Sequence, residues 1–144
     1  MSLAFRRALL TLAKADAGVT AIVSAAQVHP QAPLQTPVFP FYRYGAPDEA
    51  PRKAAGAPNG SRVSFAMHGF ALPRYNGAGA MIETAEDVCH RMGTAMVNAL
   101  DGKDVTDETG AKIKLRWDGT QIMPDGDTPD AFHAVINMSA RVLA

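Results

Sequence analysis

Two stretches rich in Gly, Pro and Ala limit the folds open to this 144-residue chain, because neither can form a packed core. Residues 45–60 contain three prolines and three glycines with almost no bulky apolar side chain, and residues 72–80 form a second loose stretch. Segments of this composition bury too little apolar surface to become ordered by themselves. We therefore expect extended loops at both places, the first an exposed arm or long hairpin loop, that become ordered by contacting other subunits.

Two helices are predicted outside these stretches. Phe5, Leu9 and Leu12 recur at helical spacing and predict an amphipathic helix near the N-terminus. The strongest helical pattern covers residues 84–100, where Thr84 is a suitable cap and the Asp-Gly pair that follows is a stop signal. Apolar residues line one side of this second helix, so we expect it to form the centre of the core.

Four segments carry strand patterns, and in the third of them Ile113, Leu115 and Trp117 alternate with basic residues before a turn or bulge predicted at Asp118-Gly119. The segments are 38–44, 61–71, 112–123 and 132–143. The order of helix, strands, helix and strands predicts a single α+β domain over residues 1–144. In this domain an antiparallel or mixed β-sheet of about four strands packs against the N-terminal helix and the central helix.

The charge pattern excludes some classes of partner. Lys plus Arg and Asp plus Glu each number 14, and a chain of zero formal charge lacks the electrostatic attraction that drives tight binding to a phosphate backbone. Residues 1–80 carry a net charge of +5 and residues 81–144 a net charge of −5, which favours head-to-tail association if the halves present different surfaces. Charges scattered over one solvated surface explain the same counts equally well.

No apolar run approaches the roughly 20 residues that cross a bilayer. Arg6 and Arg7 also interrupt the N-terminal segment before an apolar core of the signal-peptide type can develop. We expect no membrane partner and a protein that stays in the cell that makes it.

The residue types that carry catalysis form no known motif in this chain. Cys89 is the single cysteine, which excludes an internal disulfide and a multi-thiolate metal site. The adjacent His90 lies about 100° away around the helix axis and cannot act as its base, so we expect Cys89 to be a small buried residue. His29, His68 and His133 have no metal-binding spacing. We predict no catalytic residue, no cofactor and no metal site.

An aromatic segment near the first strand permits two interpretations. Phe39, Phe41, Tyr42 and Tyr44, with Arg43 among them, could stack on the bases of a single-stranded nucleic acid. A sheet face packed against the helices explains Phe39 and Phe41 more simply, and leaves Tyr42 and Tyr44 at the surface. Because interfaces between proteins are enriched in aromatic residues and Arg, we prefer an interface role for the two tyrosines.

Four segments of the chain resemble the tail-completion family of long-tailed phages, which includes tail-terminator and tail-to-head joining proteins. They are LAFRRALLTLAKADAGVTAIV, QVHPQAPLQTPVFPFYRYG, MIETAEDVCHRMGTAMVNALDG and DAFHAVINMSARV. The resemblance spans nearly the whole chain and is carried by a pattern of elements, not by an active-site motif. The Pro- and Ala-rich stretch at 45–60 departs from the usual member.

The resemblance implies a small structural subunit of the virion, not an enzyme, found at the tail or neck after assembly in the host cytoplasm. Such subunits form a ring, commonly a hexamer, that caps the finished tail tube and joins it to the head connector or stopper protein. DNA is then only a passing cargo in the lumen. The family supplies no catalytic residues to carry over.

Two sets of residues follow from the ring hypothesis. The first set would contact adjacent subunits or rings and consists of Tyr42, Tyr44, Arg52, Lys53, Arg74 and Tyr75. The second set consists of acidic candidates for the lumen, Asp104, Asp107, Glu108, Asp125 and Asp127.

Two other functions stay open at this stage. The nearest is a neck adaptor or minor tail protein at another level of the particle. From a different class comes a small ligand-binding domain or enzyme, which would use the scattered histidines and carboxylates.

Overall fold

A computed structural model describes residues 3–33, 35–45, 48–54, 57–106 and 109–142. Its elements in chain order are α1 Leu3–Ala15, α2 Ala17–Thr20, the 3-10 turn η1 Ala25–Gln27, β1 Val28–His29, β2 Phe41–Tyr44, β3 Asp48–Ala54, β4 Ala57–Ala71, β5 Arg74–Tyr75, β6 Met81–Glu83, α3 Ala85–Leu100, β7 Asp104–Thr106, β8 Lys112–Pro124 and β9 Phe132–Val142. The predicted α+β class is confirmed. Within the described ranges, none of the helices combines the length and the apolar character that crossing a bilayer requires.

The main sheet is larger than the sequence predicts. Its strands run in the order β1-β2-β4-β9-β8-β7, and β3 pairs with one half of β4, so the described residues form seven strands where about four were expected. The β1–β2 pair is parallel and the other pairs of this sheet are antiparallel. The four expected strands are present as β2, β4, β8 and β9. The additional strands are short or poor in apolar residues, and therefore leave no alternating pattern in the sequence.

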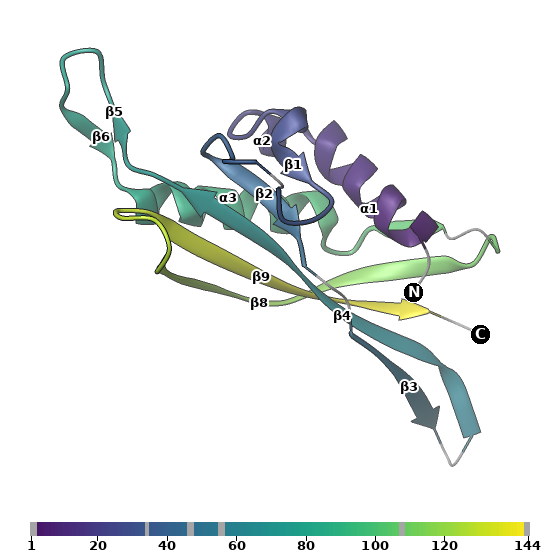
Figure 1. The fold of residues 1–144 in the computed structure, drawn as a ribbon. Helices are drawn as coiled ribbons and strands as arrows, with labels where there is room; N and C mark the ends of the chain where they lie inside the picture. Colours follow the sequence, from purple (N-terminus) through teal and green to yellow (C-terminus); the bar gives the residue numbers. More distant parts are fainter. Residues whose placement is uncertain (1–2, 34, 46–47, 55–56, 107–108, 143–144) are drawn as a thin grey trace.

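The helices cover one face of this sheet (Figure 1). Both predicted helices are confirmed, and Phe5 and Leu9 of α1 meet Met92 and Met96 of α3 in one core with the inward side chains of the strands. Full burial of a side chain of this size stabilises the fold by about 1.5–3 kcal/mol. The hydroxyl of Thr84 accepts a hydrogen bond from the Asp87 backbone N–H at 3.1 Å, so the predicted cap starts α3.

The two Gly- and Pro-rich stretches contribute to β-hairpins, which for residues 45–60 agrees with the long hairpin loop given as one of the two expected forms. Strand β3 pairs with the first half of β4, and β5 pairs with β6 in a separate two-stranded sheet. Backbone hydrogen bonds hold such ribbons together, so they form without the apolar alternation that marks a packed strand. The hairpins project from opposite ends of the subunit (Figure 1).

Trp117 does not share the burial of Ile113 and Leu115, with which it alternates in the sequence. The two aliphatic side chains are 2% and 1% exposed, whereas Trp117 is 43% exposed. The β8–β9 register shifts directly after Trp117, between Trp117 and Gly119, which marks a bulge at this position. The predicted turn or bulge at this position is thereby confirmed as a bulge.

Candidate interaction surfaces

The face of the main sheet that lies opposite the helices is called the outer face here. Strand register determines which side chains share it, since residues paired across neighbouring strands lie on the same side. Near the C-terminal end of β9 the outer face is basic. Near the start of β9 it is aromatic and carries imidazoles. The basic half and the two hairpins are the candidate functional surfaces, whereas Phe41 and Phe70 of the aromatic half are buried.

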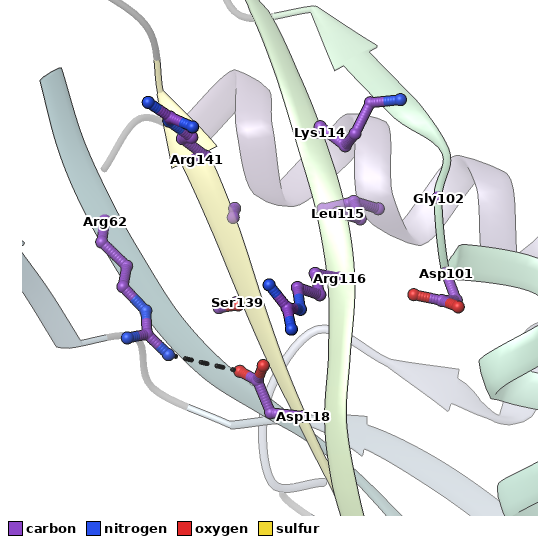
Figure 2. Close-up of a pocket in the computed structure, with 10 residues that line it drawn as sticks. Arg62, Asp101, Gly102, Lys114, Leu115, Arg116, Asp118, Ser139 and Arg141 are labelled. Carbon is purple, nitrogen blue, oxygen red and sulfur yellow. Dashed lines mark ion pairs between the residues drawn. The ribbon is translucent and has the colours of Figure 1, made fainter.

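The basic half encloses a hollow of about 630 Å³, which we call the basic hollow (Figure 2). Strand β4 contributes Arg62, strand β8 contributes Lys114 and Arg116, and strand β9 contributes Arg141. The remaining lining residues are Asp101, Gly102, Leu115, Asp118, Ser139 and Ala140. Four basic and two acidic side chains give the basic hollow a net charge of +2.

The cationic side chains of the basic hollow face one another across the strands. Arg141 is the register partner of Arg62 on one side and of Lys114 on the other. Like charges placed directly opposite in a sheet are destabilising. Asp118 lies 3.7 Å from Arg62, and an ion pair this exposed contributes about 1 kcal/mol at most. Among the described side chains, Arg141 has no carboxylate within 4.0 Å, so this row of charges is only partly compensated.

The other half of the outer face is a cluster of aromatic rings and imidazoles. His68 Nδ1 lies 2.8 Å from His133 Nε2, so one ring donates a hydrogen bond to the other. The His133 ring stacks on Phe70 with 4.2 Å between centroids, Phe70 stacks on Phe41 at 4.8 Å, and the Arg43 guanidinium lies 5.4 Å from the Phe70 centroid. The arrangement favours two neutral imidazoles packed as part of an aromatic cluster.

Burial sets the protonation state of this pair. It is the largest cause that lowers the pKa of His68 to about 4, and Arg43 and His133 lower it further. The pKa of His133 is also lowered, first by burial and then by Arg43. No local pattern in the sequence indicates this contact, because 65 residues separate the two histidines and the β4–β9 register brings them together.

The β5–β6 hairpin is fixed at its base and apolar beyond it. Glu83 accepts hydrogen bonds from Arg74 at 3.0 Å and from Arg91 Nη2 of α3 at 2.7 Å, and the Arg91 bond is the main reason that the pKa of Glu83 is lowered. The exposed apolar side chains of the hairpin are Tyr75, Met81 and Ile82, each more than half exposed. Apolar side chains gathered on a projecting ribbon are typical of a contact surface.

The tyrosines predicted to lie at an interface are buried inside the subunit. Tyr42 is 0% exposed and Tyr44 is 6% exposed, and both belong to the core beneath the helices. The Tyr42 hydroxyl donates a hydrogen bond of 2.8 Å to the Met92 carbonyl of α3, and burial raises the pKa of Tyr44 to about 12. The predicted surface position of both is therefore wrong. The two faces of β2 are the reverse of those predicted, since Phe41 was expected to pack against the helices and lies on the outer face instead.

The other predicted contact residues lie on the two hairpins. Arg52 and Lys53 are in β3, and Arg74 and Tyr75 are in β5, so the structure places the two pairs at opposite ends of the subunit (Figure 1). Both residues of β5 are exposed.

The predicted lumen residues do not form one group. Asp104 is in β7, where Lys114 lies 3.7 Å away, whereas Asp125 and Asp127 are in the β8–β9 loop at the other end of β8. Asp107 and Glu108 lie outside the described residues.

Cys89 is a small core residue, as its sequence context predicts. It is fully buried, and burial is the main cause that raises the pKa of its thiol to about 11. Among the described residues, no group of three or more His, Cys, Asp or Glu side chains could hold a metal ion.

Comparison with known proteins finds a matching family and similar solved structures. The family described as Tail completion protein gp17 matches residues 7–143. A chain in the solved structure "Virion of native gene transfer agent (GTA) particle" superimposes with a TM-score of 0.74 at 18% sequence identity, covering 98% of this chain and 96% of that chain. At this identity the likeness shows a shared fold. A search of curated proteins finds no significant match.

Proposed function

The chain belongs to the Tail completion protein gp17 family, and from this premise we propose that it forms a ring, a hexamer, that closes the upper end of a phage tail. Membership of this family makes it a structural component of the virion tail. Its proposed partners are the tail tube protein on one side and the head connector or stopper protein on the other. DNA passes through the lumen as cargo, and the role requires no catalysis.

The position of the two hairpins carries this proposal (Figure 1). In a ring of identical subunits that all point the same way around, each subunit contacts its neighbours through two different surfaces on opposite sides. The β3–β4 hairpin and the β5–β6 hairpin provide two such surfaces, because they project from opposite ends of the subunit (Figure 1). We assign Arg52 and Lys53 on β3, and Arg74 and Tyr75 on β5, to contacts with adjacent subunits or rings.

The ring proposal is tested by shortening the β3–β4 hairpin without disturbing the sheet. Ala50 and Arg62 are register partners, so residues 51–61 can be replaced by an Asn-Gly turn that joins them in a tight hairpin. We expect the wild-type protein to form rings in negative-stain images and by light scattering, and the shortened variant to remain a folded monomer. Arg52→Ala/Lys53→Ala is the matched control, because it keeps the backbone of the hairpin and removes only these two side chains. It therefore separates their contribution to ring formation from that of the hairpin backbone.

Unchanged rings and unchanged joining of heads to tails in the shortened variant would contradict the role of this hairpin. The tail tube can act as the template for ring assembly. Images of intact particles are therefore recorded in addition to the mass of the isolated protein. Density above the last tube ring supports the tail terminator. Density at another level of the particle supports a neck adaptor or minor tail protein instead.

A further inference from the structure

The positive charge of the basic hollow is only partly compensated within its own subunit, where Asp118 lies 3.7 Å from Arg62 and Asp104 lies 3.7 Å from Lys114. The net charge of the basic hollow is +2, and Arg62, Arg141 and Lys114 form a row of like charges across three strands. Such a row costs stability in the free subunit and is relieved when a group of opposite charge binds over it. The geometry of the outer face therefore points to an anionic partner.

The β8–β9 loop is acidic and is therefore complementary in charge to the basic hollow. Residues 125–130, DGDTPD, contain three aspartates and no basic residue, giving a net charge of −3. Hydrogen bonds order the loop, including Asp125 N–H to the Ala131 carbonyl at 2.9 Å and Asp127 N–H to Asp125 Oδ1 at 3.3 Å. Asp130 has a φ of 62°, a conformation that Asp tolerates better than most residues. A loop already held in shape loses little conformational freedom on binding.

The loop cannot reach the basic hollow of its own subunit. Both belong to the β8–β9 ribbon, and a strand rises about 3.3 Å per residue, so even Asp118, the lining residue of β8 nearest to the loop, lies roughly 20 Å from Pro124. Complementary surfaces at the two ends of a rigid subunit join one copy to the next. We propose that the 125–130 loop of one copy docks in the basic hollow of a second copy of this chain.

This contact rests on the proposed ring and supplies its subunit-to-subunit joint. It also gives Asp125 and Asp127 an interface position in place of the lumen position expected from the sequence. A nucleic-acid backbone is the less favoured occupant, because Asp101 and Asp118 also line the basic hollow and would repel a dense row of phosphates. The apolar β5–β6 hairpin and the acidic loop share one end of the subunit, so an apolar contact beside the charged one is available to the same neighbour (Figure 1).

Two charge-reversed variants test the contact. Arg116→Glu/Arg141→Glu changes the net charge of the basic hollow from +2 to −2, and Asp125→Lys/Asp127→Lys changes that of the loop from −3 to +1. We expect each variant alone to self-associate at least about tenfold more weakly than wild type, by sedimentation at low salt. Mixed in equal amounts, the two variants restore association, because each then meets a neighbour of opposite charge. Recovery in the mixture also shows that both variants are folded.

The outcomes separate this contact from the ring itself. If both variants form rings as wild type does, the contact is wrong and the ring proposal stands. If wild type and the mixture associate into open chains, the contact is supported and the closed ring is overturned. If the mixture stays monomeric under conditions in which wild type associates, the contact is overturned. Fluorescence anisotropy with double-stranded DNA completes the test. If wild type binds DNA, and Arg116→Glu/Arg141→Glu abolishes this binding without weakening self-association, the basic hollow is assigned to DNA and the proposal is overturned.

Discussion

Replacing Tyr42 by Phe tests whether this side chain belongs to the core of the subunit or to a contact between subunits. The ring of Tyr42 is 0% exposed and lies close to Gly69, where an added Cβ would come within 3.4 Å of the ring. Its hydroxyl donates to the Met92 carbonyl at 2.8 Å. Tyr42→Phe keeps the ring and removes only this hydrogen bond, so it changes the core while leaving the outer face untouched.

The cost of Tyr42→Phe follows from that single bond. A hydrogen bond inside a protein contributes about 0.5–1.5 kcal/mol net. The Met92 carbonyl lies inside α3, where a helical N–H already bonds to it, so the substitution leaves no unpaired buried acceptor. We expect the free energy of unfolding to fall by about 1 kcal/mol and the midpoint of thermal unfolding to fall by roughly 4 °C. Tyr42→Ala also opens a cavity and should cost about 3–5 kcal/mol.

Thermal and urea unfolding followed by circular dichroism measure these losses, and light scattering measures assembly on the same samples. Tyr75→Phe is the matched control, because Tyr75 is 56% exposed and should change stability by less than about 0.5 kcal/mol. A Tyr42→Phe protein that unfolds like wild type but no longer assembles would refute the core assignment and restore the interface role.

Three further predictions concern local contacts. Thr84→Ala removes the cap of α3 and should cost about 1 kcal/mol in urea unfolding, with no change in the slope against urea concentration. Gly45→Ala should cost about 1–3 kcal/mol, because its Cβ would lie 2.9 Å from the Ala66 carbonyl oxygen, while Gly77→Ala, with no atom within 4 Å, should be near neutral by the same assay. The pKa of His68 is lowered from 6.5 to about 4, so its contribution to stability is full above pH 6.5 and is lost as the pH falls towards 4. After allowance for its partial exposure we expect a loss of about 1–2 kcal/mol between pH 7 and 4, measured by urea unfolding across pH, and a shallower dependence in His68→Gln.

Local signals were enough to predict α3, because the cap at Thr84, the apolar side and the stop at its end all lie within one stretch of chain. The strand pairing inside the expected hairpin at 45–60 was not predicted, because the residues around Pro51 pair with β4 through the backbone and show no apolar alternation in the sequence. The phase of β2 was reversed because aromatic residues lie on both of its faces, so alternation could not identify the side under the helices.

The candidate surfaces depend on contacts that no sequence spacing reveals. The sequence does show the alternation of Lys112, Lys114 and Arg116, but their meeting with Arg62 and Arg141 requires the register of three strands. The His68–His133 pair depends on the same register. Pairing between strands far apart in the sequence is set by the packed fold as a whole, which explains why the elements were easier to predict than the surfaces.

Strand β9 is hydrogen-bonded along its length to β4 on one side and to β8 on the other. The bonds of antiparallel ladders lie across the strands, so a pull along β9 shears both ladders together and many bonds share the load. Peeling an edge strand would instead break its bonds one after another. The subunit is therefore stiff along β9, and tension applied at the acidic loop is transmitted to the opposite end of the sheet without lengthening the strands between them.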